Sequence, residues 1–491
     1  MKQLLCILSI FISISVEAQV TFERTYGGIG TDLGNAIAGT ADGGYLIVGS
    51  TNSFGVGLYA IRVDSVGDTL WTKIYQGSGS ANGYSVDTTA NGFIIAGSTN
   101  SFGAGGNDIL LIRIDSSGDT LWTRTYGGSN GEGGTDVIAN SEGGYTVAGS
   151  TSSFGAGSSD AVVIKTDANG DTLWTRTYGL SQSEGVRAIA QTSDSGYVMV
   201  GTTTSFSNGL DMFIIRINSA GDTLWTKAFE GSTLDEANDI IQTLDGGYAV
   251  CGYGDFSGNY RMVLIKLGQN GSVQWQKSYL HGTLTWGKDI HQLPDGSFVI
   301  GGVANSGADL FILKVNQFGS ILWSNGFSYL GAQGLTGMVP AKDGGFCMVG
   351  GGVYLVKVDS LGQGGCNSVT TSVNFLSPGF IVSSGCLVGS GLQMSYAPLN
   401  VLSTSTIVGN PCSSGIEDLP NFTQPTVYPN PTEGKFEVSG LEFEVGEVLV
   451  FGLLGNLLLH TESRKINLSS YPAGIYFVRV GKYAQKLILS R

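Results

Sequence analysis

Along the first three quarters of the chain, apolar residues come in short runs interrupted by glycine, asparagine and aspartate. One example spans 135–139, 144–150, 160–167 and 171–178, and each run is rich in β-branched and aromatic residues. Such runs are typical of short strands. Glycine and asparagine between the runs fit tight turns. The pattern therefore predicts four antiparallel strands, here called a, b, c and d, joined as a meander.

This four-strand unit repeats along the chain. Near-copies of an Asp-Thr-Leu-Trp segment place six tryptophans about fifty residues apart, a period typical of propellers and solenoids: Trp71, Trp122, Trp174, Trp225, Trp275 and Trp323. Groups of strands a to c number seven, at 34–64, 83–115, 134–167, 185–218, 236–268, 287–316 and 335–359. An aromatic residue opens every strand b and predicts packing between units: Tyr45, Phe93, Tyr145, Tyr197, Tyr248, Phe298 and Phe346.

The seventh unit lacks a strand d, and an unassigned strand at 21–28 matches 123–128 in sequence. A strand that completes the last unit closes a ring and removes both free sheet edges. We therefore predict an all-β chain whose residues 19–366 form a seven-bladed β-propeller. Its blades are four-stranded and antiparallel, and the N-terminal strand closes the last one. A β-helix is the alternative fold.

Composition agrees with many strands and tight turns, because 77 of 491 residues are glycine and only 13% are charged. The net charge is −14. A negative chain is repelled by phosphate backbones and anionic lipid headgroups. We expect no nucleic-acid partner.

The N-terminus has the pattern of a secretory signal peptide over residues 1–18. Lys2 precedes an apolar run from Leu4 to Ile14, and we predict cleavage between Ala18 and Gln19. No later stretch has the roughly 18 apolar residues that a transmembrane helix needs. The sequence therefore predicts an exported protein without a transmembrane segment.

Five cysteines follow the signal, an odd number in a compartment that permits disulfides, so at least one stays free or pairs outside the chain. Residues 367–425 are rich in Ser, Thr and Gly and are expected to form a strand-bearing linker region, which a disulfide between Cys366 and Cys412 would close. Pairing of Cys386 with either of them remains an alternative.

The last segment, 426–491, resembles the type A C-terminal sorting domain of the type IX secretion system. The residues that carry the resemblance are Tyr428, Pro429, Asn430, Pro431, Gly434, Gly455, Gly474 and Tyr476. The resemblance implies a small β-sandwich and the secretion machinery as a partner. It also implies release from the cell or attachment to the outer-membrane surface after passage through the periplasm. A C-terminal adhesion module is the alternative.

The repeat region is similar to propeller repeats that accompany such sorting domains. Its Asp-Thr-Leu-Trp segments also resemble the tryptophan-docking repeats of pyrroloquinoline quinone enzymes, but only over the c–d hairpin. The chain has no adjacent cysteine pair to support quinone binding. We interpret the likeness as shared packing between blades.

The sixth unit departs from its siblings and supplies a candidate ligand site. Trp286 and Lys288 are expected where its strand a begins, near one mouth of the axial channel, and His291 is expected within that strand. A tryptophan beside polar groups suits a sugar or another flat ligand. Drift of a single repeat is the alternative explanation.

Two repeated patterns have both a functional and a structural interpretation. Asp167 to Asp171, with relatives at 64–68 and 115–119, could bind calcium or form an Asx-turn hairpin. Apart from that possible calcium, we expect no cofactor and no other metal site. Every strand c ends with a basic residue that could form an anion-binding ring or, in the four units with an aspartate two positions later, pair with that acid: Arg62, Arg113, Lys165, Arg216, Lys266, Lys314 and Lys357.

No residue set is predicted to be catalytic. The sequence favours a binding or interaction scaffold for a glycan or a protein, with a purely structural surface role as a further possibility. The alternative is a carbohydrate-active hydrolase or lyase that uses carboxylates around the channel mouth. Those carboxylates, for which solvated loop acids are the simpler explanation, are Asp32, Glu132, Glu184, Asp235 and Glu236.

Overall fold

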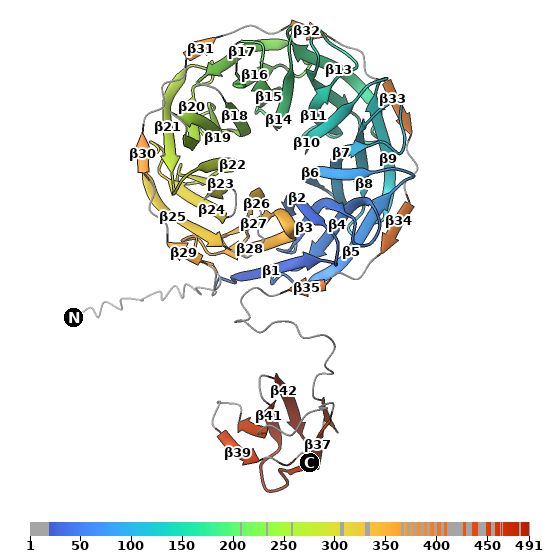
Figure 1. The fold of residues 1–491 in the computed structure, drawn as a ribbon, viewed down its shortest axis with the longest axis vertical. Helices are drawn as coiled ribbons and strands as arrows, with labels where there is room; N and C mark the ends of the chain where they lie inside the picture. The colour runs from blue at the N-terminus through green and yellow to red at the C-terminus, as the bar shows by residue number, and fades with distance from the viewer. Residues whose placement is uncertain are drawn as a thin grey trace, which may run out of the picture. The chain divides into compact units, whose positions relative to one another are not determined.

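The computed structural model shows a ring of blades around a central axis (Figure 1). It describes residues 19–206, 209–231, 234–256, 259–304, 309–328 and 334–364, seven short strands between 368 and 409, and segments of 426–490. The chain divides into two compact units, 1–412 and 413–491, of which the first contains the ring. Among the described residues, no helix has the length and apolarity needed to cross a membrane.

The seven-bladed propeller is confirmed, with four antiparallel strands in chain order in each of the first six blades. Blade 1 comprises β2 (Asp32–Gly39), β3 (Tyr45–Thr51), β4 (Gly57–Val63) and β5 (Thr69–Gln76). Blade 2 comprises β6 (Ala81–Thr89), β7 (Gly92–Thr99), β8 (Asp108–Ile114) and β9 (Thr120–Gly127). Blade 3 comprises β10 (Glu132–Ala139), β11 (Tyr145–Thr151), β12 (Asp160–Thr166) and β13 (Thr172–Gly179). Blade 4 comprises β14 (Glu184–Gln191), β15 (Tyr197–Thr203), β16 (Asp211–Ile217) and β17 (Thr223–Glu230). Blade 5 comprises β18 (Asp235–Gln242), β19 (Tyr248–Phe256), β20 (Asn259–Leu267) and β21 (Val273–Leu280). Blade 6 comprises β22 (Thr285–Gln292), β23 (Phe298–Ala304), β24 (Asp309–Val315) and β25 (Ile321–Ser328).

Blade 7 is closed by the N-terminal strand, as predicted. It combines β26 (Leu335–Pro340), β27 (Phe346–Gly350) and β28 (Tyr354–Val358) with β1 (Phe22–Gly27), and a short 3-10 turn (Gly351–Val353) precedes β28. Strand β1 pairs antiparallel with β28, with Glu23 opposite Val356. Tyr354 donates a hydrogen bond to Glu23 at 2.7 Å. The two ends of the repeat region thus share one sheet.

The hydrophobic core lies between neighbouring blades. The described residues form seven such clusters in the ring, one at each blade interface, including the interface between blades 7 and 1. All seven aromatic residues that open strand b are buried. The tryptophan of one blade meets the ring of the next, as in Trp122–Tyr145 at 5.7 Å and Trp225–Tyr248 at 5.7 Å between ring centroids. The predicted packing between blades is confirmed.

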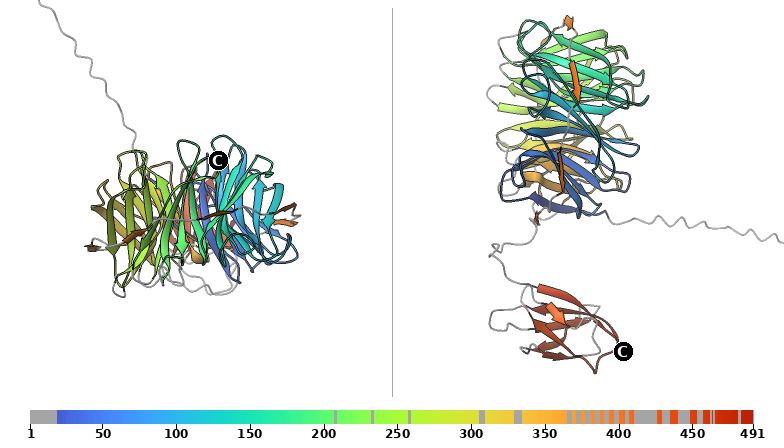
Figure 2. Two further views of the ribbon diagram at one scale, coloured as in Figure 1. Left: turned by 90° about the horizontal axis from the view of Figure 1, so that it is seen from above. Right: turned by 90° about the vertical axis from the view of Figure 1, so that its right-hand side faces the viewer.

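A fifth strand lies on the outer edge of every blade, whereas the sequence pattern predicts only four strands per blade. These strands come from 368–409 and form what we call the belt: β29 (Ser368–Thr370), β30 (Asn374–Leu376), β31 (Ile381–Ser383), β32 (Leu387–Gly389), β33 (Gln393–Tyr396), β34 (Asn400–Ser403) and β35 (Ile407–Gly409). They add to blades 6, 5, 4, 3, 2, 1 and 7 in that order, so the belt runs around the ring against the blade order (Figures 1 and 2). The segment predicted to be a linker therefore contributes a strand to each blade.

The cysteines fall into two groups. Cys251 and Cys347 are buried and free, which agrees with the expected free thiol. Cys366, Cys386 and Cys412 lie outside the described residues, as does Ala18. Gln19 is described, and its side-chain oxygen accepts a hydrogen bond from the Ser360 amide at 2.9 Å. The Cys366–Cys412 disulfide and the cleavage site both stay predictions.

Each aromatic residue on strand d packs against a glycine in the c–d turn of the next blade. The pairs are Trp71–Gly118, Trp122–Gly170, Trp174–Gly221, Trp225–Gly271, Trp275–Gly319, Trp323–Gly362 and, across the closure, Phe22–Gly67. The indole nitrogens of Trp71 and Trp174 also donate to carbonyls of that turn at 3.1 and 3.2 Å. The likeness to tryptophan-docking repeats thus corresponds to packing between blades.

We predict that Gly170→Ala lowers the free energy of unfolding by about 2 to 5 kcal/mol. Gly170 has φ +80°, and a methyl group there would lie 2.9 Å from the Trp122 ring. A left-handed alanine costs about 1–2 kcal/mol and overpacking adds about 1–3 kcal/mol. Gly143→Ala is the matched control, because Gly143 has φ +95° and nothing within 4 Å of such a methyl group. Equal losses in urea unfolding would show that the ring contact contributes nothing.

The second compact unit contains two sheets. One consists of β36 (Thr426–Tyr428), β37 (Lys435–Ser439) and β40 (Lys465–Asn467), and the other of β38 (Val448–Gly452), β39 (Leu457–Thr461), β41 (Gly474–Val480) and β42 (Tyr483–Leu489). Phe436 and Ile466 of the first sheet join Val450, Val478 and Leu487 of the second in one core. Gly474 and Tyr476 lie on β41 and Tyr428 on β36, whereas Pro429, Asn430, Pro431, Gly434 and Gly455 lie outside the described residues.

Candidate functional site

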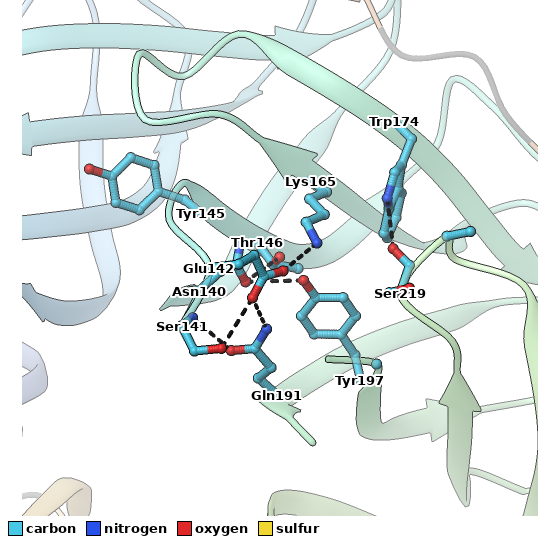
Figure 3. A network of polar contacts seen from close by, with 12 residues as sticks. Asn140, Ser141, Glu142, Tyr145, Thr146, Lys165, Trp174, Gln191, Tyr197 and Ser219 are labelled. Carbon is cyan, nitrogen blue, oxygen red and sulfur yellow. Dashed lines mark hydrogen bonds and ion pairs between the residues drawn. The ribbon is translucent and has the colours of Figure 1, made fainter. Parts of the chain in front are cut away.

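Polar side chains gather between neighbouring blades on the face of the ring that carries the a–b and c–d turns. Figure 3 shows the group between blades 3 and 4. Blade 3 contributes Glu142 from its a–b turn and Lys165 from β12, and blade 4 contributes Gln191 from the end of β14. Glu142 accepts hydrogen bonds from Lys165 and Gln191, both at 2.6 Å. The Gln191 side-chain oxygen accepts the Ser141 amide at 2.9 Å.

These groups are fixed by the blade packing beneath them. Trp174 of β13 donates to the Ser219 carbonyl of blade 4, and the Tyr197 hydroxyl of blade 4 donates to Asn140 of blade 3 at 3.1 Å (Figure 3). The Lys165 ammonium lies 5.5 Å from the centre of the Tyr197 ring. Burial alone would raise the pKa of Glu142, but the hydrogen bonds from Lys165 and Gln191 lower it to about 2. The carboxylate is therefore ionised at neutral pH.

The same acid–base pair recurs in six blades and corrects the predicted partner. The strand c cation bonds the acid of its own a–b turn, in pairs such as Arg62–Asp42 at 2.6 Å, Arg216–Asp194 at 2.5 Å and Lys357–Asp343 at 2.9 Å. The aspartate two positions after the cation is engaged otherwise: Asp64 accepts the amides of Val66 and Asp68. The cations are thus paired within their blades. Arg113 of blade 2, whose a–b turn has no acid, bonds the Tyr145 hydroxyl at 3.1 Å instead.

Two interfaces carry a cavity above this arrangement. Between blades 4 and 5 the cavity measures about 410 Å³, and between blades 5 and 6 about 460 Å³. In each cavity, one blade contributes its acid–base pair and its strand d tryptophan. The next blade contributes the glutamine that ends its strand a and the aromatic residue that opens its strand b. In the second cavity these are Asp245, Lys266, Trp275, Gln292 and Phe298, with Gln317 and Phe318 from the c–d turn.

The length of the acid distinguishes these interfaces from the one in Figure 3. Glu142 reaches Gln191, whereas the side-chain nitrogens of Gln242 and Gln292 donate weakly to the Gly246 and Gly296 carbonyls at 3.4 and 3.3 Å. The side-chain oxygens of Gln242 and Gln292 accept hydrogen bonds from the a–b turn of the preceding blade. The donors are the amides of Ser193 and Leu244, both at 2.8 Å. At these two interfaces the glutamine amides thus line the cavities beside the shorter aspartates.

The chemistry of the two cavities is that of hydrogen bonding beside aromatic rings. Burial alone would raise the pKa of Asp245, but hydrogen bonds from Thr243 and Lys266 lower it to about 2. A hydrogen bond from Thr192 and the charge of Arg216 lower the pKa of Asp194. Ionised carboxylates accept hydroxyl protons, amides donate and accept, and ring faces cover apolar carbons. This set of groups suits a polyhydroxylated ligand.

The structure brings Trp286 and Lys288 together but separates His291 from them. Trp286 stacks on Tyr253 with ring centroids 5.1 Å apart, and the Lys288 ammonium lies 5.9 Å from the Trp286 ring centre. Tyr260 meets the Trp286 ring edge-on. His291 bonds Asp289 at 3.1 Å and the Met338 carbonyl at 2.9 Å. Ligand binding by these three residues stays a prediction.

The acids proposed for the channel mouth are buried and structural, which corrects their interpretation as solvated loop acids. Asp32, Glu132, Glu184, Asp235 and Glu236 are each at most 6% exposed. Glu132 accepts the Gly128 amide at 2.8 Å and the Thr151 hydroxyl at 2.9 Å, so it joins the d–a connection to the end of strand b. Glu184 bonds the Leu180 amide and the Thr203 hydroxyl in the same way.

The c–d hairpins adopt the turn that the sequence analysis gives as the alternative to calcium binding. Asp167 accepts the amides of Asn169 at 2.8 Å and Asp171 at 2.9 Å. Asp171 lies 3.7 Å from Arg124 of the preceding blade. Within the described part of the chain, no group of three or more His, Cys, Asp and Glu side chains is arranged to hold a metal.

Comparison with known proteins identifies the second compact unit. Residues 426–490 match the family described as secretion system C-terminal sorting domain. This segment therefore marks the chain for type IX secretion, which indicates export and a secreted or cell-surface location.

Other known proteins match the chain only in part. Regulatory protein FlaEY of Caulobacter vibrioides is 27% identical over 164 residues, which cover 28% of this chain and 17% of that protein. Two crystal structures of Sqt1 from Chaetomium thermophilum align with 68% of this chain and with 98% and 97% of theirs. Their sequence identities are 10% and 12%, and both TM-scores are 0.41.

Proposed function

We propose that this type IX secretion substrate acts, after export, as a glycan-binding scaffold. Its ligands would occupy the cavities between blades 4 and 5 and between blades 5 and 6. The observation that carries the proposal is the repetition of one set of groups at adjacent interfaces: an ionised acid–base pair, a fixed glutamine and two aromatic rings, above open space.

The size of the cavities supports small saccharide units. Volumes of about 410 and 460 Å³ lie in the lower part of the range for ligand pockets, roughly 300–1,000 Å³. Exposed apolar side chains form part of each rim, Leu224 at 55% and Phe318 at 64% exposure. A ring edge or methyl group beside an amide and a carboxylate is an arrangement that can hold a sugar ring by its carbons and its hydroxyls. Repeated sites would add avidity on a polymeric glycan.

The test is a glycan array with the secreted chain, followed by calorimetric titration with the best oligosaccharide. We expect Phe318→Ala to weaken binding at least about tenfold, which corresponds to about 1.4 kcal/mol. Val66→Ala is the matched control, because Val66 holds the same position in the c–d turn of blade 1 and is also exposed. It should leave the affinity unchanged.

Two results would contradict the proposal. One is an array without a bound glycan, and the other is binding that Phe318→Ala and Leu224→Ala together leave intact. Shortening of a bound polysaccharide during the assay would instead favour the carbohydrate-active enzyme.

A further inference from the structure

Pairs of buried acids face each other on the opposite side of the ring from the cavities. Strand c of blades 2 and 3 begins with Asp108 and Asp160, and strand a of blades 3 and 4 begins with Glu132 and Glu184. A methyl group built on Gly127 would lie 1.8 Å from an Asp108 oxygen and 2.7 Å from a Glu132 oxygen. On Gly179 the same distances, to Asp160 and Glu184, are 1.9 and 2.7 Å. Each glycine thus leaves room for two carboxylates to meet.

The carboxylates in these pairs have no cation beside them. Asp108 is 1% exposed and Glu132 3% exposed. None of the ion pairs among the described residues includes either acid. Two adjacent buried negative charges repel each other strongly, because the protein interior screens them little. The charge must be neutralised.

One oxygen of the first pair has no hydrogen-bond partner. Asp108 Oδ1 accepts only the Ala104 amide, at 3.3 Å, and Asp108 Oδ2 accepts nothing from the described residues. Glu132 is held by the Gly128 amide, the Thr151 hydroxyl and the Ser153 amide at 2.8, 2.9 and 3.2 Å. The site therefore has one fixed carboxylate and one carboxylate with a buried oxygen left over. Burial and the charge of Glu132 raise the pKa of Asp108, and burial and Glu184 do the same for Asp160.

Both oxygens of Asp160, in contrast, accept amides, from Ala156 at 3.3 Å and from Gly157 at 3.0 Å. We propose that the Asp108–Glu132 pair binds a hard divalent cation such as calcium, as one ion between blades 2 and 3. Two carboxylates balance the double positive charge. All side-chain donors are oxygens, which select calcium or magnesium over softer metals. Waters and backbone carbonyls would complete the coordination, since calcium takes about six to eight oxygen ligands. The ion would bridge blades 2 and 3 and so stabilise the ring.

The chain contains its own comparison sites. Between blades 1 and 2 the equivalent positions are Gly57 and Ala81, which lack carboxylates. In blade 1, Asp32 holds the position of Glu132 and accepts the Gly28 amide and the Thr51 and Ser53 hydroxyls. Asp32 lies at the interface between blades 7 and 1, where strand c of blade 7 begins with Tyr354 rather than an acid. Asp32 therefore accepts hydrogen bonds in its loop as Glu132 does, but the strand c opposite it does not begin with an acid.

The test is thermal unfolding of the secreted chain with calcium chloride or with EDTA. We expect calcium to raise Tm by about 2 to 4 °C or more, because a ligand that binds only the folded state stabilises it. The variant Asp108→Asn should lose most of this shift. In EDTA it should melt no lower than the unsubstituted chain, since the repulsion between the acids is gone. Asp32→Asn and Asp167→Asn should keep the shift.

Three other outcomes would each overturn the proposal. A Tm that calcium and magnesium leave unchanged, in a chain that acidification to pH 5 in EDTA stabilises, would show that the pair holds a proton instead. A shift that persists in the Asp108→Asn variant would place the ion elsewhere. Loss of the shift in Asp167→Asn alone would place it in the c–d hairpin.

Discussion

A chain that ends at Gly364 should self-associate at micromolar concentration, whereas a chain that ends at Cys412 should stay monomeric. The shorter chain lacks the belt and exposes the outer edge of strand d in all seven blades. Unpaired strand edges are templates for pairing between molecules. The Tm values of the two chains should differ by only a few degrees. Each belt hydrogen bond contributes roughly 0.5–1.5 kcal/mol, while ordering a residue costs about 1–2 kcal/mol.

Size-exclusion chromatography with light scattering measures this difference directly. The chain that ends at Cys412 is the control, because it keeps the whole first compact unit and lacks only the second. Both chains keep the turn that follows β28, in which the Asp359 amide donates a hydrogen bond to the Gln363 carbonyl. Two monodisperse monomers with equal Tm would mean that the belt strands do not cover the blades.

Deletion of 21–28 should abolish cooperative unfolding of the ring. The deletion removes β1, and with it Phe22 and Tyr26 from the core between blades 7 and 1. Tyr26 also donates to the Gly67 carbonyl at 2.6 Å. Loss of a buried aromatic side chain costs about 3–5 kcal/mol, so two cost about as much as the whole stability of a typical domain, roughly 5–15 kcal/mol. The strand β35 loses its partner as well.

Rescue by a peptide separates this effect from general damage. A peptide with the sequence of residues 19–28 should restore a sharp thermal transition, because it can pair with the free edge of β28. The same peptide with Phe22→Ser and Tyr26→Ser should not. A deletion variant that melts as sharply as the intact chain would show that β1 does not close the ring.

The propeller could be predicted from the sequence because each blade repeats a strong local pattern. The Asp-Thr-Leu-Trp segments and the aromatic residue at the start of strand b both place packing between blades at a fixed period. Closure followed from the missing strand d and the extra N-terminal strand. These features depend on residues close in sequence or on a simple count of units.

Strands were expected in the segment that forms the belt, but their pairing with the blades could not be predicted by the same rules, because they have only three or four residues and no alternation long enough to define a buried face. They add to existing edges, so backbone pairing rather than side-chain pattern defines them. One signal was available. The strands begin every six or seven residues and number seven, which equals the number of blades. Six or seven extended residues reach about 20 to 25 Å, a length suited to stepping from one blade to the next.

The candidate site was only partly predictable. The strand c cations were identified from the repeat, but their partners were placed two positions later, where period two puts them on one face of the strand. In the structure the partner comes from the a–b turn, as with Lys266 and Asp245. The cavities combine side chains of two blades, and no local pattern in the sequence marks the interfaces that leave space.

The most direct test of the closed ring and its belt is disulfide trapping of the belt order, in a chain whose Cys366, Cys386 and Cys412 are replaced by serine. Thr177 of blade 3 pairs with Gly389, and Ala228 of blade 4 pairs with Ser383. Cysteines introduced as Thr177→Cys with Gly389→Cys, or Ala228→Cys with Ser383→Cys, should form a disulfide under mild oxidation, and Thr177→Cys with Ser383→Cys should not. Efficient trapping of 177 with 383 and none of 177 with 389 would contradict a belt that runs around the ring against the order of its blades.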